Sequence, residues 1–124
     1  FFVGQRSLAI LARKPLTRTL VGFSLSKNHT GPIPKECHLV IDSGEIAGRV
    51  TSVTFSPTLG QVIGLAYVKP EQSKLGSSIE IRVERADMIR ATVVRTPFYD
   101  PENLRQCLDC VVRRAKTLLV IAHP

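Results

Sequence analysis

Histidine and cysteine are the side chains in this sequence that could hold a metal or act as nucleophiles, and they are scattered. The three histidines are His29, His38 and His123, and only Cys37 stands directly beside one of them. Because neighbouring residues on a strand point to opposite faces, Cys37 and His38 would not share a metal ion. We interpret His38 as a partly exposed strand residue, and we predict no metal site at this pair.

A second cysteine motif is Cys107-x-x-Cys110, in a segment that we expect to be helical. A structural zinc site needs four ligands, and the sequence offers no second pair of Cys or His. A redox Cys-x-x-Cys belongs to a thioredoxin-like arrangement, which is not found here. Two ordinary half-buried cysteines are the favoured interpretation, with a disulfide or a metal site as open alternatives. Three cysteines, an odd number, favour free thiols in a reducing cytoplasm.

Groups that could perform catalysis or bind phosphate do not converge along the chain. Ser52 and Ser56 have no histidine and acid around them in sequence, so no nucleophilic triad is predicted. The glycines at 44, 48, 60 and 64 lack the Lys-Ser/Thr ending or the third glycine of a phosphate-binding loop. Taken alone, the chain is therefore expected to be a binding or structural module rather than an enzyme.

Length and charge narrow the class of protein further. The chain has 124 residues, 44% of them hydrophobic and 22% charged, which suits one globular domain. The net charge is +7, but the 17 Lys and Arg are dispersed and no aromatic residues alternate with them. Base-stacking surfaces require such aromatics, so the sequence does not favour nucleic acid as a partner. A stand-alone basic module that binds RNA or another partner is kept as the alternative.

Membrane insertion is not predicted, because no apolar run reaches the ~18–20 residues of a transmembrane helix. The first residues, Phe1 to Gly4, contain neither a Met nor a basic-then-apolar leader. We interpret this start as a cut from a longer polypeptide.

The hydrophobic pattern predicts six short strands with no helix between them. Strands spaced in this way favour an antiparallel sheet, and closure into a barrel would remove its exposed edges. We expect an all-β, six-stranded antiparallel barrel with short flanking helices at both ends. The expected strands are 19–25, 37–41, 45–55, 62–68, 79–83 and 88–94, and the expected helices are 3–14 and 102–114.

Details within the strands are predicted from alternation and turn residues. Ser43-Gly44 suits a tight hairpin turn between the second and third strands. In the third strand, alternate residues from Ile46 to Thr54 should share one face, with a bend or bulge at Gly48. The fourth strand, 62–68, is nearly continuously apolar and should be buried on both faces. The apolar stretch 118–122 has no predicted place.

Several motifs, in order, resemble the C-terminal domain of the glycine-cleavage T-protein (aminomethyltransferase) family. Residues 46–60 carry the signature G-x-V-T-S-x-x-x-S-P-T-L, and residues 63–68 carry I-G-L-A-Y-V. Residues 97–101 read P-F-Y-D-P, a match to the closing motif, and residues 2–8 resemble the helix that leads into the domain. The resemblance covers residues 2–105 and implies a six-stranded Greek-key barrel.

The resemblance also implies a role in one-carbon chemistry. In this family tetrahydrofolate accepts a one-carbon unit, and the folate pocket and catalytic acid belong mainly to a larger N-terminal portion. The barrel packs over that portion, so its implied partner is the N-terminal folate-binding domain of the same polypeptide. Other subunits of an oxidase or a glycine-cleavage complex are further implied partners. FAD or NAD would be held only in other parts of such an assembly.

The family includes sarcosine oxidase alpha subunits and related dehydrogenases as well as aminomethyltransferases. The pair Arg6-Ser7 in the leading segment favours the sarcosine oxidase branch slightly. No position matches a catalytic residue of the family, so none is carried over.

The resemblance marks a small set of candidate site residues. The signature residues Thr51, Ser52, Ser56 and Pro57 should face the folate domain, with turn and hairpin chemistry as the alternative. Tyr99, in the closing motif, is a candidate folate contact, although the family's tyrosine falls slightly later in the sequence. We expect a leading helix from a preceding domain at 1–16, the barrel at 17–101, and a helix and tail of unknown role at 102–124.

Overall fold

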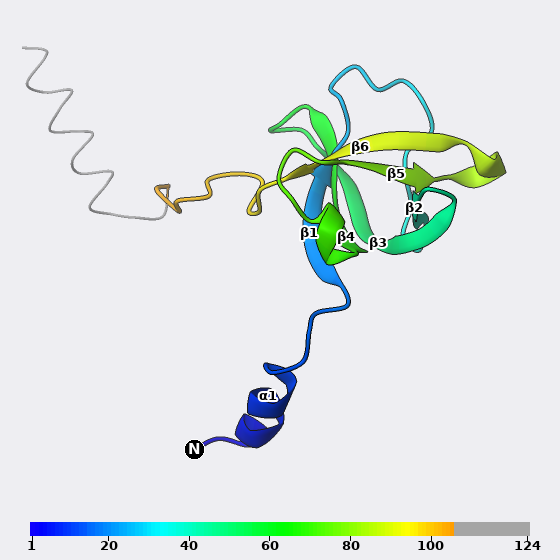
Figure 1. Cartoon of the computed structure of the whole chain (residues 1–124). Coiled ribbons are helices and arrows are strands. Elements are labelled where there is room, and N and C mark those ends of the chain that lie inside the picture. The colour runs from blue at the N-terminus through cyan, green and yellow to red at the C-terminus, as the bar shows by residue number, and fades with distance from the viewer. Residues whose placement is uncertain (106–124) are drawn as a thin grey trace, which may run out of the picture.

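The computed structural model describes residues 1–105, and the six strands in this part of the chain close into an antiparallel barrel (Figure 1). Around the barrel the strands follow the order β1-β4-β3-β2-β5-β6, and β6 pairs with β1. This confirms the predicted all-β, six-stranded barrel. The strands are β1 (Thr19–Ser24), β2 (Leu39–Asp42), β3 (Glu45–Ser56), β4 (Gln61–Val68), β5 (Ser78–Arg82) and β6 (Met88–Val94).

The order of the strands is that of a Greek key. Strands β2, β3 and β4 follow one another as hairpin neighbours, and β4 then pairs with β1. The connection from β1 to β2 crosses the end of the barrel, because these two strands are not neighbours. Three consecutive hairpin strands beside a fourth that joins through a long connection define the motif. The predicted turn Ser43-Gly44 joins β2 to β3 with φ of 51° and 86°, as a type I′ turn requires.

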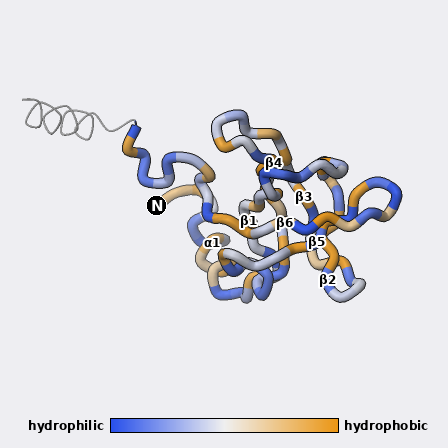
Figure 2. Tube along the Cα trace, turned by 90° about the horizontal axis from the view of Figure 1, so that it is seen from above, coloured by the Kyte–Doolittle hydropathy of each residue, from blue (hydrophilic) through white to orange (hydrophobic). Residues whose placement is uncertain are grey.

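Alternate residues of the strands fill the barrel, which supplies the hydrophobic core. The largest fully buried side chains include Phe23 of β1, Leu25 just after it, and Ile79 and Ile81 of β5. The hydrophobic stretches of the trace lie largely on the strands, whereas the loops around them are mostly hydrophilic (Figure 2). The cluster consists of Val21, Phe23, Leu25, Val40, Ala47, Val50, Val62, Ala66, Val68, Ile79, Ile81, Val83, Ile89, Ala91 and Val93.

The prediction that alternate residues from Ile46 to Thr54 share one face is wrong, because β3 contains two irregularities. Opposite β2 the register shifts between Val40 and Ile41, which leaves Ala47 as an extra residue. Opposite β4 it shifts between Val50 and Ser52, which leaves Thr51 as an extra residue. An extra residue reverses the alternation beyond it. Ile46 is therefore 64% exposed, and Ala47 is buried instead. The bulge predicted at Gly48 lies one residue away.

The prediction for the fourth strand is also wrong, because β4 is buried on one face. Its side chains alternate, with Val62, Ala66 and Val68 inside the barrel and Tyr67 44% exposed outside. The second strand begins at Leu39 rather than at Cys37, which has a left-handed backbone with φ of 69°. Apolar composition alone could not distinguish one buried face from two.

The two ends of the chain differ from the barrel. The N-terminal helix α1 (Gln5–Leu11) is shorter than the predicted 3–14, and none of its residues is buried. It stands away from the barrel at the start of β1 (Figure 1). At the other end, Glu102 to Arg105 form turns, so the predicted helix 102–114 does not begin there. Its remainder, Cys107, Cys110 and the stretch 118–122 lie outside the described residues.

Two short 3-10 helices complete the described chain, η1 (Pro70–Gln72) before β5 and η2 (Glu84–Ala86) between β5 and β6. Within residues 1–105, no helix is long and apolar enough to cross a membrane.

Candidate functional site

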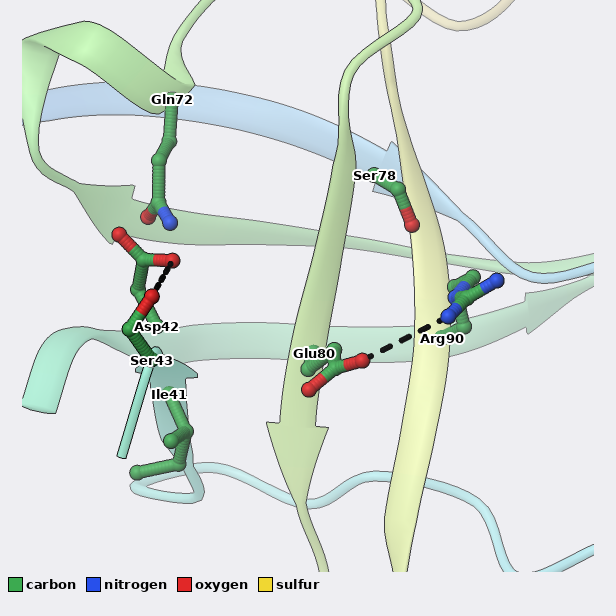
Figure 3. A pocket seen from close by; sticks show the side chains of 7 residues that line it. All are labelled: Ile41, Asp42, Ser43, Gln72, Ser78, Glu80 and Arg90. Atoms are coloured by element: carbon green, nitrogen blue, oxygen red, sulfur yellow. Dashed lines mark hydrogen bonds and ion pairs between the residues drawn. The ribbon is translucent and has the colours of Figure 1, made fainter. Parts of the chain in front are cut away.

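A polar hollow at the edge of β2, β5 and β6 brings acidic and basic side chains together (Figure 3). Glu80 and Arg90 form a loose ion pair across it, with 3.6 Å between carboxylate and guanidinium. The Ser43 hydroxyl donates a hydrogen bond of 3.4 Å to Asp42, and Gln72 points toward the same carboxylate. The Glu80 and Arg90 side chains are 49% and 76% exposed, so solvent screens the charges. This hollow is a solvated polar surface.

The histidines of the barrel are engaged in local hydrogen bonds. The backbone N–H of Lys35 donates to Nδ1 of His38 at 3.0 Å, and Nε2 of His29 lies 2.9 Å from the carbonyl of Pro32. In the described part of the chain, no three His, Cys, Asp or Glu side chains gather as metal ligands would. Cys37 is exposed and free.

Thr51 stabilises the β3 bulge at the centre of the signature segment. Its hydroxyl donates a hydrogen bond of 3.0 Å to the carbonyl of Leu65 on β4. This bond bridges the two strands at the point where their register shifts. The side chain therefore holds the bulge in place, in keeping with the hairpin chemistry considered as an alternative.

Ser56 and Pro57 shape the turn that joins β3 to β4. The Ser56 hydroxyl accepts a hydrogen bond of 3.3 Å from the backbone N–H of Leu59. The carbonyl of the same serine accepts one of 2.8 Å from Gly60, whose φ is 65°. Hydroxyl groups at the first position of a turn commonly satisfy the backbone in this way. Ser56 is thereby tied to the turn, in which Pro57 also lies.

Ser52 is the signature residue that faces away from the barrel. It is exposed, and it pairs with Leu65 across β3 and β4, while Thr54 pairs with Ile63. A shallow, largely apolar hollow of about 160 Å³ lies over these pairs. We call it the Phe98 hollow, and it is lined by Ser52, Val53, Thr54, Ile63, Gly64, Leu65 and Phe98.

Phe98 reaches this hollow because β1 has a glycine at the right place. A Cβ atom at Gly22 would lie 2.5 Å from Cγ2 of Thr96 and 3.0 Å from the Phe98 ring. The closing segment thus folds back over the outside of β1, and only glycine leaves room beneath it. Sequence reasoning recognised the motif at 97–101 but did not identify Gly22 or Leu65 as its neighbours. A glycine within a predicted strand was the available signal.

Tyr99, the candidate folate contact, does not line the Phe98 hollow. Its ring is 44% exposed and lies under the guanidinium of Arg105, 4.8 Å from the ring centroid. Asp100 orders this turn, since its carboxylate accepts hydrogen bonds of 2.9 Å and 3.0 Å from the backbone of Leu104 and Arg105. The structure therefore places Ser52 in the lining of the hollow, whereas Thr51, Ser56, Pro57 and Tyr99 are not among its lining residues.

Basic side chains gather at the end of the barrel where β1 begins and β4 ends. Arg18, Arg49 and Lys69 line one hollow there, together with the β3 bulge at Ala47 and Gly48. The acidic neighbour within the described residues is Glu45, 3.7 Å from Lys69. Residues 1–35 hold six Lys and Arg and no acid, whereas residues 36–105 hold eight basic and nine acidic side chains. Within residues 1–105, the excess of basic over acidic side chains therefore comes from residues 1–35.

Comparison with known proteins places this arrangement in a family. Residues 18–100 match the family model described as the glycine cleavage T-protein C-terminal barrel domain. A probable aminomethyltransferase from Thermococcus gammatolerans is 41% identical over 102 residues, covering 82% of this chain and 25% of the relative. The aminomethyltransferase of Bacillus subtilis is 35% identical over 98 residues, covering 79% of the chain and 26% of the relative.

A solved structure agrees with the sequence comparisons. The crystal structure of glycine cleavage system aminomethyltransferase T from Bartonella henselae superposes with a TM-score of 0.63 and 25% identity, over 76% of this chain and 25% of that one. The chain spans about a quarter of the length of the relatives that it matches.

Proposed function

The chain belongs to the glycine cleavage T-protein C-terminal barrel family, and from this premise we propose that it serves as the accessory barrel of a tetrahydrofolate-dependent aminomethyltransferase. In this role it would pack over the folate and one-carbon site formed by an N-terminal portion of the polypeptide. The observation that carries the proposal is the match over residues 18–100, together with relatives in which the matched region is a quarter of the length.

The chemistry of the described residues supports an accessory role. No buried side chain of the core is polar or charged. Tetrahydrofolate presents a polar pteridine ring, and a buried site for it would need converging hydrogen-bond partners. The Phe98 hollow is apolar and shallow, so these residues do not make a folate site by themselves. We therefore derive no chemical step within the barrel, and the residues of the reaction would belong to the remainder of the polypeptide.

A chimeric enzyme tests the proposal directly. Residues 18–100 would replace the matching barrel of the Bacillus subtilis aminomethyltransferase, and transfer of the aminomethyl group to tetrahydrofolate would be measured. We expect activity within about tenfold of the parent enzyme, which corresponds to a loss of at most about 1.4 kcal/mol in transition-state stabilisation. The parent with its barrel deleted is the inactive control. A chimera that unfolds in one cooperative transition but lacks activity would contradict the proposal.

Binding to the isolated 124-residue chain provides a second test. We expect calorimetry to detect no association with tetrahydrofolate below a dissociation constant of about 1 mM, which corresponds to about −4 kcal/mol. Tighter binding would show that the barrel holds its own folate site, against an accessory role. If the full-length polypeptide oxidised sarcosine in place of transferring an aminomethyl group, the chain would belong to the sarcosine oxidase branch.

A further inference from the structure

The outer surface of the barrel has two faces of different chemistry. Five apolar side chains lie together on the outside of β1 and β4. One belongs to β1, three belong to β4, and one comes from the closing segment. Leu20 and Tyr67 are 50% and 44% exposed, and they lie opposite one another in the register. The remaining members are half-buried around the hollow already described. We call this set, Leu20, Ile63, Leu65, Tyr67 and Phe98, the Phe98 face.

The face on the other side of the barrel is charged. Arg82 and Glu80 alternate with buried residues on β5, and Glu80 pairs with Arg90 of β6. This alternation of buried apolar and exposed charged residues is typical of a strand that faces water. A sheet that is solvated on one side does not need apolar side chains there, so the Phe98 face requires a different explanation.

The basic end of the barrel continues the Phe98 face. Arg49 pairs with Tyr67 in the register, and both residues are exposed, so they lie next to one another on the outside of neighbouring strands. Arg18 immediately precedes β1, and Lys69 immediately follows β4. A surface that covers this region would be apolar over the hollow and acidic beside Arg18, Arg49 and Lys69.

We propose that the Phe98 face, with its basic end, is the surface through which this barrel docks on the preceding part of a full-length aminomethyltransferase polypeptide. The inference rests on the proposed function and specifies the side of the barrel that is covered. Exposed aromatic and apolar groups beside a charged rim are the usual composition of a protein interface.

The course of the chain argues for this occupant. The arm formed by residues 1–18 reaches the barrel at Arg18, beside the basic hollow that it helps to line. Every residue of that arm is exposed, including Leu8 and Leu11 on α1. The relatives are about four times as long as the matched region. The preceding part of a longer polypeptide would therefore join the barrel at Arg18, directly beside the Phe98 face.

Cysteine labelling tests which face is covered. In a background with Cys37, Cys107 and Cys110 replaced by serine, Thr54→Cys would report on the Phe98 face and Arg82→Cys on the charged face. Both positions are exposed in the barrel. Labelling rates would be compared between the 124-residue chain and the Bacillus subtilis chimera, with the cysteines of the host also replaced. A chimera built in the Thermococcus gammatolerans relative provides a second host.

We expect Thr54→Cys to react at least about tenfold more slowly in the chimera than in the chain, because docking excludes the reagent. Arg82→Cys should react at equal rates in both. Equal rates for Thr54→Cys, or protection of Arg82→Cys instead, would overturn the proposal. The proposal would also be overturned if the isolated 124-residue chain formed a dimer in which Thr54→Cys is protected. Failure of both chimeras to fold, while the chain itself folds, would overturn it too.

Activity distinguishes this inference from the function on which it rests. Protection of Thr54→Cys in an inactive, folded chimera would support the docking face and contradict the proposed function. An active chimera in which Thr54→Cys is not protected would support the proposed function and contradict the docking face.

Discussion

At the residue scale, the hydroxyl of Thr51 has a structural task that a β-branched hydrocarbon could not perform. The bulge in β3 leaves the carbonyl of Leu65 facing Thr51, and the hydroxyl donates to it at 3.0 Å. Thr51→Val keeps the shape and removes the donor. We expect a loss of about 1 kcal/mol in the free energy of unfolding, measured by urea denaturation. Thr51→Ser should retain most of the stability, and an equal loss in both variants would contradict this role.

The ion pair between Lys35 and Glu84 offers a test of local electrostatics. The Lys35 ammonium donates to the Glu84 carboxylate at 2.6 Å, and this hydrogen bond and charge lower the pKa of Glu84, with a smaller contribution from His38. A lowered pKa stabilises the fold above the ordinary pKa of the carboxyl, and the contribution disappears as the pH falls through the folded value. Lys35→Met should therefore raise the pKa of Glu84 in an NMR titration. Because the Glu84 side chain is 67% exposed, solvent screens the pair, and the free energy of unfolding near neutral pH should hardly change. An unchanged pKa would show that the pair does not persist in solution.

At the scale of elements, the helix α1 and the barrel differ in what holds them. A seven-residue helix without buried residues gains little from packing, and isolated helices of this length are marginal in water. Deletion of residues 1–16 should therefore change the free energy of barrel unfolding by less than about 0.5 kcal/mol. Thermal denaturation monitored by circular dichroism would measure this. A larger loss would show that the arm packs against the barrel after all.

The existence of the strands could be read from the sequence, but their faces could be read only where pairing is regular. In β5, Ile79 and Ile81 alternate with charged residues, and both are buried as expected. In β3 the extra residues Ala47 and Thr51 reverse the inner and outer sides. Such shifts depend on two partner strands, and a single strand's pattern does not contain them.

The contacts of the Phe98 hollow could not be predicted from the sequence either, because they join residues that are far apart in the chain. The closing motif identified residues 97–101, but the contact that positions Phe98 is with Gly22. Only the closed barrel, with β6 beside β1, brings these two residues together. Likewise, Ser56 and Ser52 stand four residues apart in one motif, but one is tied to a turn and the other faces outward.

At the scale of the whole molecule, the two outer faces can be compared by matched variants. Leu20→Ser with Arg49→Glu alters the Phe98 face, and Met88→Ser with Arg82→Glu alters the charged face. Each pair removes one half-exposed apolar side chain, at 50% and 45% exposure, and reverses one arginine. In the isolated chain both pairs should have similar, small effects, because neither apolar residue belongs to the core.

In the full-length chimera the two pairs should diverge. Loss of an interfacial anchor together with a reversed charge costs about 2 kcal/mol or more when the face is covered. The variant of the Phe98 face should therefore melt several degrees lower than the unmodified chimera. Its tetrahydrofolate-linked activity should fall about tenfold or more. The variant of the charged face should keep both. Because the isolated chain supplies the baseline for each pair, a difference that appears only in the chimera measures docking and not barrel stability. Equal losses for the two pairs would mean that the Phe98 face is not where the barrel meets the rest of the enzyme.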